Sequence, residues 1–250
     1  MFDLTGRVAL VTGAGQGVGS GIARELSRSG ATVVVNDRDS ERAELAVAGL
    51  RADGAVADAA PFDVGDFEAV RRGVAVVTDA HGPVSILVNN AGIPPGMELL
   101  PFRDTMPEDW RSYFDVNAQG VMHCCWAVLD GMRRSGWGRI ITISSGAATI
   151  GSRLGTSIYA ASKGAAIAFM RNLALEEARQ GVTANTVALG MMDNVGANDG
   201  EALGRAARDV PVGRLGRPAD AGALCVYLAS EEAAWMTGQT LQLNGGAPTT

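Results

Sequence analysis

A phenol and an ammonium stand four positions apart in the segment Tyr159-Ala160-Ala161-Ser162-Lys163. On a helix, side chains at this spacing lie on one face, about one turn apart. A nearby positive charge favours the phenolate and lowers the pKa of a tyrosine from its ordinary value of ~10. Tyr159 is therefore a candidate general acid/base near neutral pH, although Tyr and Lys at this spacing also occur by chance on surface helices.

Two polar side chains upstream of Tyr159 could take part in the same reaction. Ser145 follows a short apolar run, and a hydroxyl at the carboxyl end of a strand can donate a hydrogen bond to a substrate carbonyl oxygen. Asn117 carries an amide that can hold a water molecule, which would relay protons from Lys163 to solvent. Each also has an ordinary structural role open to it, because a serine can begin a turn and an asparagine can bond the backbone of a helix.

A glycine-rich segment, Thr12–Gly19, follows the first strand-like run and opens the first helical pattern. Glycine permits a tight turn and lets a backbone approach a pyrophosphate closely. The helix N-terminus then offers free N–H groups to that anion. Three glycines alone are a weak indicator, but the strand before, the helix after and an acidic residue ending the next strand supply the context of a dinucleotide-binding fold.

That acidic residue, Asp37, indicates which dinucleotide is favoured. A carboxylate here accepts hydrogen bonds from the ribose hydroxyls of NAD and repels the 2′-phosphate of NADP, while its alternative role is a turn or a helix N-cap. Arg38 complicates the choice, since an arginine can stack on adenine or contact a 2′-phosphate. Gln16 stands where a basic residue would help NADP. We therefore expect NAD as the cofactor, with NADP less favoured.

Short apolar runs alternate with amphipathic segments and predict the elements that position these residues. Repeated strand–helix–strand units with right-handed crossovers predict an α/β fold with a doubly wound parallel sheet flanked by helices. The first four β-branched runs are typical of strands covered on both faces. We expect strands at Val8–Val11, Thr32–Val35, Ile86–Val88, Ile140–Ile143 and Val182–Val187, and helices at Gly21–Ser29, Ser40–Arg51 and Phe67–Ala80.

We expect residues 1–250 to form a single Rossmann-type domain, because no low-complexity linker or internal repeat divides the chain. The segments 92–107 and 189–209 are rich in Gly, Pro, Met, Asn and Asp. Loops after strands gather at the carboxyl edge of such a sheet, where ligands bind. These two segments are therefore the candidate substrate loops, although plain surface loops often share their composition.

Composition argues against several other classes of protein. Lys and Arg number 21 and Asp and Glu number 27, so the net charge of −6 disfavours binding to a nucleic-acid backbone. The two histidines and three cysteines lack metal-ligand spacing, so no metal site is expected. The cysteines cannot form a disulfide framework, which favours a reducing, cytoplasmic setting. No stretch of about 18 apolar residues is present, so we expect no membrane span.

The chain resembles the short-chain dehydrogenase/reductases over essentially its full length. The motifs that carry the resemblance occur in the family's order: Thr12–Gly19, Asp63-Val64, Asn89-Asn90-Ala91-Gly92, Asn117, Ser145, Tyr159–Lys163 and Thr237–Gly246. The resemblance implies a catalytic tetrad of Asn117, Ser145, Tyr159 and Lys163. In it Tyr159 exchanges a proton with the substrate oxygen and Ser145 orients that oxygen. Lys163 holds the nicotinamide ribose and lowers the pKa of Tyr159.

The resemblance also implies a set of residues around the cofactor. Asp63 and Val64 would lie at the adenine, Asn90 at the adenosine ribose, and the backbone of Met192 near the nicotinamide amide. The full expected cofactor-binding set is Gly13, Gln16, Gly17, Val18, Gly19, Asp37, Arg38, Asp63, Val64, Asn90, Ala91, Gly92, Tyr159, Lys163, Met192 and Asn194. Members of the family are usually homotetramers, packed through the helices that carry Asn117 and Tyr159 and through the C-terminal strand.

The sequence departs from the family pattern in places. Tyr159 follows Ser145 by 14 positions, one more than usual, so one residue is inserted within 146–158. Leu189-Gly190 replaces a proline-glycine pair, and Asn194 stands where a threonine often binds the nicotinamide amide. The segment 93–110 is longer than in the 3-oxoacyl-thioester reductases, which argues against that substrate class.

These features predict an NAD(H)-dependent oxidoreductase that interconverts a secondary alcohol and a ketone. Few charges lie in the two candidate loops, so we expect a small, uncharged and apolar substrate. An NADPH-dependent 3-oxoacyl-thioester reductase is one alternative, for which Arg133, Arg134 and Arg139 could form a basic patch that docks an acidic carrier protein. A nucleotide-sensing protein that keeps the fold but does no chemistry is another alternative.

Overall fold

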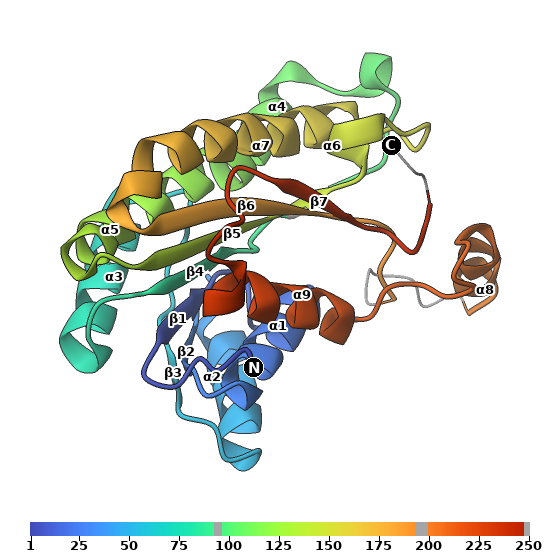
Figure 1. Ribbon diagram of the computed structural model, residues 1–250. Helices are drawn as coiled ribbons and strands as arrows, with labels where there is room; N and C mark the ends of the chain where they lie inside the picture. Colours follow the sequence, from blue (N-terminus) through green and yellow to red (C-terminus); the bar gives the residue numbers. More distant parts are fainter. Residues whose placement is uncertain (93–96, 194–199, 248–250) are drawn as a thin grey trace.

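The computed structural model describes residues 1–92, 97–193 and 200–247, with side chains 200–203 left out. Within these residues one parallel sheet runs in the order β3-β2-β1-β4-β5-β6-β7 (Figure 1). Its strands are β1 (Val8–Val11), β2 (Thr32–Val35), β3 (Ala57–Ala59), β4 (Ile86–Asn89), β5 (Gly138–Ser145), β6 (Val182–Leu189) and β7 (Thr240–Leu243). This sheet confirms the predicted doubly wound α/β architecture.

Helices cover both faces of the sheet. One face is packed by α1 (Gly17–Arg28), α2 (Ser40–Ala52) and α9 (Pro218–Ala229), and the other by α3 (Phe67–His81), α5 (Gly120–Ser135) and α7 (Ser157–Glu177). Shorter elements sit mostly near the carboxyl edge of the sheet. They are α4 (Pro107–Phe114), the π-helical segment η2 (Asp115–Gln119), α6 (Ala147–Ile150) and α8 (Gly200–Asp209).

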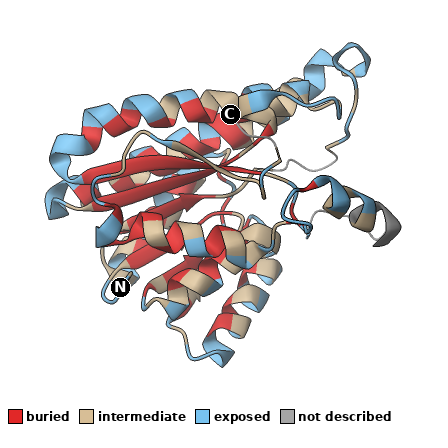
Figure 2. Cartoon of the chain, turned by 45° about the vertical axis from the view of Figure 1, so that its right-hand side comes forward, coloured by how far each residue is buried: buried red, intermediate tan, exposed pale blue. Residues whose placement is uncertain are grey.

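The apolar runs form strands because they are buried on both sides. In β1, Ala9 and Val11 face α1, α2 and α9, whereas Val8 and Leu10 face the helices of the opposite layer. A strand covered twice has no polar face, which explains why these runs show no alternation in the sequence. Figure 2 shows the buried sheet between the two helical layers.

The strand order reverses between β1 and β4, and this reversal locates the ligand site. The chain leaves β1 toward α1 on one face and leaves β4 toward α4 and α5 on the other, so a crevice opens between the two exits. In open α/β sheets such a switch point at the carboxyl edge is where ligands bind. Strands β5 and β6 pair over their full lengths, from Gly138 with Val182 to Ser145 with Leu189, and carry that edge outward.

Strands β3 and β7 and the start of helix α1 were not predicted from the periodicity of the sequence. Strand β3 is the short sequence Ala-Asp-Ala, and β7 is a half-buried edge strand of alternating Thr, Leu and Gln, so neither forms a β-branched run. Helix α1 begins at Gly17, earlier than the expected Gly21, with Gln16 as its N-cap. The glycines that open α1 hide its start because glycine is a poor helix former.

Other features of the described residues bear on the excluded classes of site. No helix among them is long and apolar enough to cross a membrane. No group of three or more His, Cys, Asp or Glu side chains in the described parts of the chain is placed to hold a metal ion. Cys124, Cys125 and Cys225 are free thiols in the core, and burial raises the pKa of each.

A buried carboxylate joins α7 to α5 at the end of the sheet away from the crevice. Glu177 is 1% exposed, and its carboxylate accepts two hydrogen bonds from the Arg133 guanidinium, one of them 2.8 Å long from Nε to Oε2. Loss of one partner from such a pair leaves an uncompensated buried charge, which is strongly destabilising. Arg134 is the next residue and is exposed.

We therefore expect Arg133→Ala to lower the temperature of thermal unfolding by several degrees, because Glu177 keeps its burial but loses its counterion. Arg134→Ala is the matched control and should unfold close to wild type, since surface substitutions have small effects. Scanning calorimetry of the two variants makes the comparison. Equal losses in both variants would contradict a specific role for the pair.

Candidate active site

A cleft of about 790 Å³ lies at the carboxyl edge of the sheet, at the switch point between β1 and β4. Its lining begins at Asp37, passes along the glycine-rich loop and ends at Tyr159 and Lys163. The sequence places these residues far apart, and the parallel strands bring their carboxyl ends to this one edge. The cleft is therefore continuous from the expected adenosine end to the expected reacting end.

The glycine-rich loop is braced by the chain that follows β4. The Thr12 hydroxyl oxygen accepts the backbone N–H groups of Asn90 and Ala91 at 3.0 and 3.1 Å. The Asn90 side-chain amide donates to the carbonyl oxygens of Thr12 and Gly13 at 2.9 and 3.0 Å. Asn90 thus holds the loop through its NH₂ group. Its predicted contact with the adenosine ribose stays a prediction.

Glycines keep this loop open for a ligand. Gly13 and Gly17 have φ values of 60° and 59°, which favour glycine. A Cβ on Gly13 would lie 2.9 Å from Ala91 Cα, and one on Gly19 would lie 2.9 Å from Ala14 Cα. On Gly92 a Cβ would run into the Lys163 ammonium. The backbone therefore forms a cradle at a helix N-terminus, which fits the pyrophosphate of a dinucleotide.

Asp37 lies at the carboxyl end of β2 and is 6% exposed. Its Oδ1 accepts the backbone N–H of Asp39 at 3.1 Å and the Arg42 Nη2 at 3.0 Å. Arg42 was not among the residues predicted from the sequence, although its place in the first turn of α2, beside the end of β2, is the signal that points to it. Arg38 and Gln16 are exposed and also line the cleft.

The expected adenine end of the cleft is formed by the segment after β3. Val64 is buried, and Asp63 is exposed with its Oδ1 accepting the Gly65 N–H at 2.8 Å. The carbonyl oxygen of Val64 lies 2.9 Å from Nδ1 of His123 on α5, so that ring donates to it in the matching tautomer. His123 is a second supporting residue that the sequence analysis did not identify, because the contact links residues far apart in the chain.

The two serines at the end of β5 have different surroundings. The Ser144 hydroxyl is buried and donates to the carbonyl oxygen of Lys163 at 3.4 Å. The Ser145 hydroxyl accepts the backbone N–H of Ala147 at 3.2 Å, and its interaction with the Tyr159 phenol lowers the pKa of that phenol. Ser145, the predicted serine, is therefore the one of the two that acts on Tyr159. Gly151 and Gly155, with φ values of 77° and 67°, turn the longer connection to α7.

Tyr159 and Lys163 share one face of α7, but their charges are set by burial. Lys163 is 4% exposed, and its ammonium donates to the Ile143 carbonyl oxygen at 2.8 Å. Burial lowers the pKa of Lys163 to about 8. Burial also raises the pKa of Tyr159 above its ordinary value, and the Ser145 hydrogen bond acts in the opposite direction. The expected lowering of the Tyr159 pKa by Lys163 is not among these effects, since the ammonium is directed to Ile143.

Asn117 lies beneath the cleft in η2, where the helix widens to a π-helical turn. Its side chain is fully buried, and its Nδ2 donates to the Ser162 hydroxyl oxygen at 2.9 Å. Its Oδ1 has no hydrogen-bond partner among the described residues. A Cβ on Gly92 would lie 3.0 Å from this oxygen and also against the Lys163 ammonium. All four residues of the predicted tetrad therefore meet at one end of the cleft.

A second pocket of about 330 Å³ shares Tyr159 with the lining of the cleft. It lies between segments 97–113 and 155–159. This pocket takes part of its lining from the first predicted substrate loop, 92–107, and the rest from α4 and the start of α7. The predicted substrate location between loops 92–107 and 189–209 stays a prediction. Met192, 6% exposed, lines the first cleft instead. Asn194 lies outside the described residues.

A phenol, a hydroxyl and a buried amine at the end of a dinucleotide cradle are the groups that an oxidoreductase needs to exchange a proton with a carbonyl or hydroxyl oxygen. Comparison with known proteins leads to the same class. The profile of the short chain dehydrogenase family matches residues 7–201. The chain belongs to the short-chain dehydrogenase/reductase family and is an oxidoreductase.

Several related proteins align with nearly the whole chain. It is 37% identical to the short-chain reductase protein NovJ of Streptomyces niveus, over 96% of this chain and 94% of the relative. It is 38% identical to the 3-oxoacyl-(acyl-carrier-protein) reductase FabG of Vibrio cholerae, over 98% of each. The solved structure of a gluconate 5-dehydrogenase from Burkholderia cenocepacia, in complex with NADP and tartrate, aligns with a TM-score of 0.90 at 34% identity, over 98% of this chain and 96% of that one.

The buried ammonium predicts that Lys163→Met stabilises the protein at neutral pH. The folded-state pKa of about 8 lies below the ordinary value of 10.5, so burying the charged amine destabilises the folded protein. This destabilisation is present in full below about pH 8, where both the folded and the unfolded chain carry the proton. The variant should gain on the order of 1–3 kcal/mol at pH 7, after allowing for the lost hydrogen bond to Ile143.

Urea unfolding of wild type and Lys163→Met at several pH values measures this difference. The advantage of the variant should shrink as pH rises from 8 toward 10.5, because the folded wild type then sheds its buried charge while the unfolded chain keeps a proton. A variant less stable than wild type at pH 7, or an advantage that does not change with pH, would contradict the assigned burial cost.

Proposed function

We propose that the protein is an NAD(H)-dependent oxidoreductase that interconverts a secondary alcohol and a ketone, with Tyr159 as the general acid/base. One observation carries the proposal: Tyr159, whose phenol interacts with Ser145, lines both the long cleft and the second pocket. A cofactor in the cleft and a substrate in the pocket would therefore meet at this hydroxyl.

The side chains divide the work at that junction. The bound dinucleotide supplies hydride acceptance or donation. Tyr159 takes a proton from the substrate hydroxyl in oxidation and returns one to the oxygen in reduction. Ser145 donates a hydrogen bond that holds this oxygen in place. The Lys163 ammonium would favour the phenolate through its positive charge when it faces Tyr159, and it would contact the nicotinamide ribose of the bound cofactor.

The preference for NAD is supported by the charge of Asp37. Its carboxylate is buried at the end of β2 and would face the adenosine ribose, where a 2′-phosphate would meet a like charge. Arg38 and Arg42 stand beside it, and Arg42 already neutralises part of that charge. The preference for NAD is therefore moderate in size, and Asp37 is the residue that maintains it.

A neutral substrate fits the second pocket. Apolar and aromatic side chains make up half of its fourteen described lining residues, including Met97, Leu100, Trp110 and Ile158. The pocket carries more charge than the sequence analysis led us to expect, because Glu98, Asp104 and Asp109 also line it. None of its described lining residues is Lys or Arg. The carboxylates disfavour an anionic substrate, so we propose an uncharged ketone or alcohol that offers hydroxyl groups to the pocket rim.

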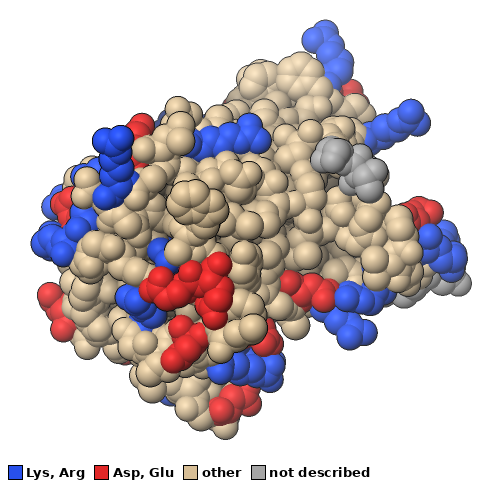
Figure 3. Space-filling view, in the orientation of Figure 1, with Lys and Arg blue, Asp and Glu red and all other residues tan. Residues whose placement is uncertain are grey.

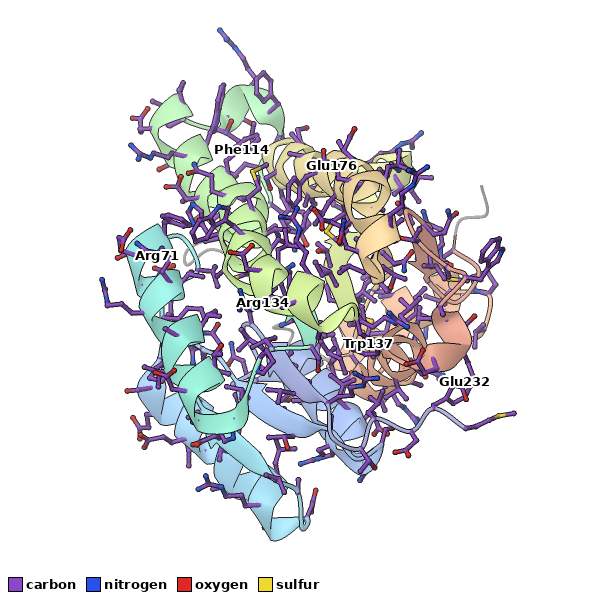
Figure 4. All side chains as sticks on the ribbon, turned by 60° about the vertical axis from the view of Figure 1, so that its left-hand side comes forward. Arg71, Phe114, Arg134, Trp137, Glu176 and Glu232 are labelled. Atoms are coloured by element: carbon purple, nitrogen blue, oxygen red, sulfur yellow. The ribbon has the colours of Figure 1, made fainter. Side chains whose placement is uncertain are left out.

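An NADPH-dependent 3-oxoacyl-thioester reductase is the second candidate, favoured by the similarity to FabG. The predicted basic docking patch does not form, because Arg139 is 2% exposed and Arg133 is bonded to Glu177. Arg134 is exposed but lies in the last turn of α5, at the end of that helix away from η2 (Figure 4). On the face in Figure 3, Arg and acidic side chains are interspersed. These observations favour the first candidate.

We also propose that the protein is a homotetramer in the cytoplasm. Large apolar side chains are exposed on the outer faces of α5 and α7, with Trp126 60% and Leu175 79% exposed, and a partner subunit would cover them. The free, buried cysteines agree with a reducing compartment.

Tyr159→Phe should abolish turnover while NADH binding and the unfolding temperature stay near wild type, since only the exchangeable proton is removed. A loss of at least about 100-fold in kcat is expected for a general acid/base. The assay uses neutral secondary alcohols and ketones with both cofactors. Full turnover by the variant would overturn the acid/base assignment. Turnover confined to carboxylates or acyl thioesters would overturn the substrate class.

Asp37→Asn should move the cofactor preference toward NADP by at least about tenfold in the ratio of kcat/KM values, because Arg38 and Arg42 are then left to attract the 2′-phosphate. Asp58→Asn is the matched control. Asp58 also pairs with an arginine, Arg51, but lies on β3 and does not line the cleft. A wild-type enzyme that strongly prefers NADPH would overturn the argument from Asp37.

A further inference from the structure

Ser162 lies between Tyr159 and Lys163 on α7, but it has no role in the proposed reaction described above. It is fully buried, as is Asn117. Its hydroxyl donates to the carbonyl oxygen of Tyr159 at 2.8 Å and accepts the Asn117 Nδ2 at 2.9 Å. A buried hydroxyl with two such partners is a link between η2 and α7.

The directions of these two bonds are forced by chemistry. A serine hydroxyl carries a single proton, and a carbonyl oxygen can only accept one. The proton of Ser162 is therefore given to the Tyr159 carbonyl, and only its lone pairs face Asn117. The atom of Asn117 that faces Ser162 must then be a donor, which is the NH₂ end of the amide. Ser162 thereby selects one of the two orientations of the amide that are otherwise nearly equal in shape.

The selected orientation directs the Asn117 carbonyl oxygen to the other side. There it has no partner among the described residues and shares the space above Gly92 with the Lys163 ammonium. That ammonium has three protons, and one is donated to Ile143. An acceptor dipole on this side stabilises the charged form of the amine, whereas an NH₂ group in the same place would oppose it.

We propose that Ser162 is a positioning residue: it orients the Asn117 amide so that its oxygen faces the Lys163 ammonium. The residue acts on the reaction only through Asn117 and Lys163. The kinetic consequence rests on the proposed function, but the orientation itself does not. Gly92 is part of the arrangement, since any side chain there would fill the space between the oxygen and the ammonium.

Other charged groups near Lys163 are few in the described part of the chain. Tyr159 lies on the same helix, and Asp115 begins η2 with its oxygens bonded to Arg111 and Gln119. The remaining titratable groups that line the cleft lie toward its adenosine end: Asp37, Arg38, Arg42 and Asp63. The Asn117 oxygen is thus a polar atom next to the ammonium, and the direction in which this oxygen points is set by one neighbouring hydroxyl, that of Ser162.

The chain offers a direct readout, because Lys163 is its only lysine. Protein grown on lysine labelled with ¹³C at Cε gives one side-chain NMR signal, and its pH titration reports the pKa of Lys163 without cofactor or substrate. Ser162→Ala should lower this pKa by roughly half a unit or more, and Ser162→Thr should restore it because threonine keeps the hydroxyl. In the assay, Ser162→Ala should lower kcat at neutral pH with little change in the KM for the cofactor.

Ser230→Ala is the matched control. Ser230 is also fully buried, and its hydroxyl donates to the carbonyl oxygen three residues earlier, that of Tyr227, at 2.7 Å, but it does not line the cleft. This variant should leave the Lys163 titration unchanged. An unchanged Lys163 pKa in folded Ser162→Ala, or an equal shift in Ser230→Ala, would overturn the proposal.

Asn117→Ala keeps the proposal testable if Ser162→Ala fails to fold. Removing the oxygen itself should lower the Lys163 pKa in the same direction, and no change would overturn the proposal. The titration is independent of turnover. A wild-type protein that titrates as expected but oxidises no alcohol would therefore overturn the proposed function and leave the role of Ser162 standing.

Discussion

The site depends on a buried cation. Lys163 is 4% exposed, and its ammonium donates a hydrogen bond to the Ile143 carbonyl oxygen, 2.8 Å from Nζ. An ammonium out of water is costly unless polar partners surround it. The fold supplies one such partner, the Ile143 carbonyl oxygen near the end of β5, and the absence of a side chain on Gly92 leaves room for the ammonium. Burial lowers the pKa of the amine to about 8 all the same, which places the proton equilibrium of Lys163 close to neutral pH.

The parallel sheet makes this arrangement possible. Because all strands point the same way, the loops after β1, β2, β4 and β5 gather at one edge, and the reversal between β1 and β4 opens the cleft there. Tyr159 then belongs both to the cleft and to the second pocket. Its position, more than its pKa in the structure, qualifies it for proton exchange, since burial alone raises that pKa.

Charge balance differs between the two ends of the cleft. At the adenosine end, Asp37 is partly neutralised by Arg42, and Arg38 stands exposed beside it. At the pocket beyond Tyr159, Glu98, Asp104 and Asp109 face the opening with no described Lys or Arg in the lining. In the proposed function, the cleft would accept negative charge near the cofactor and the second pocket would disfavour it on the substrate.

The sequence by itself determined the α/β class and the order of most elements, and it predicted the residues of the tetrad, because these follow from local patterns: doubly covered β-branched runs, a glycine-rich turn and a Tyr–Lys spacing of one helical turn. Strand β7 and Arg42 were not predicted, since an edge strand has no continuous apolar run and an ion pair between a strand end and a helix has no local signature. Tertiary structure alone decided that Ser162 meets Asn117. It also set the pKa of Lys163, because burial depends on how η2, β5 and α7 pack together and not on which residues neighbour Lys163 in the chain.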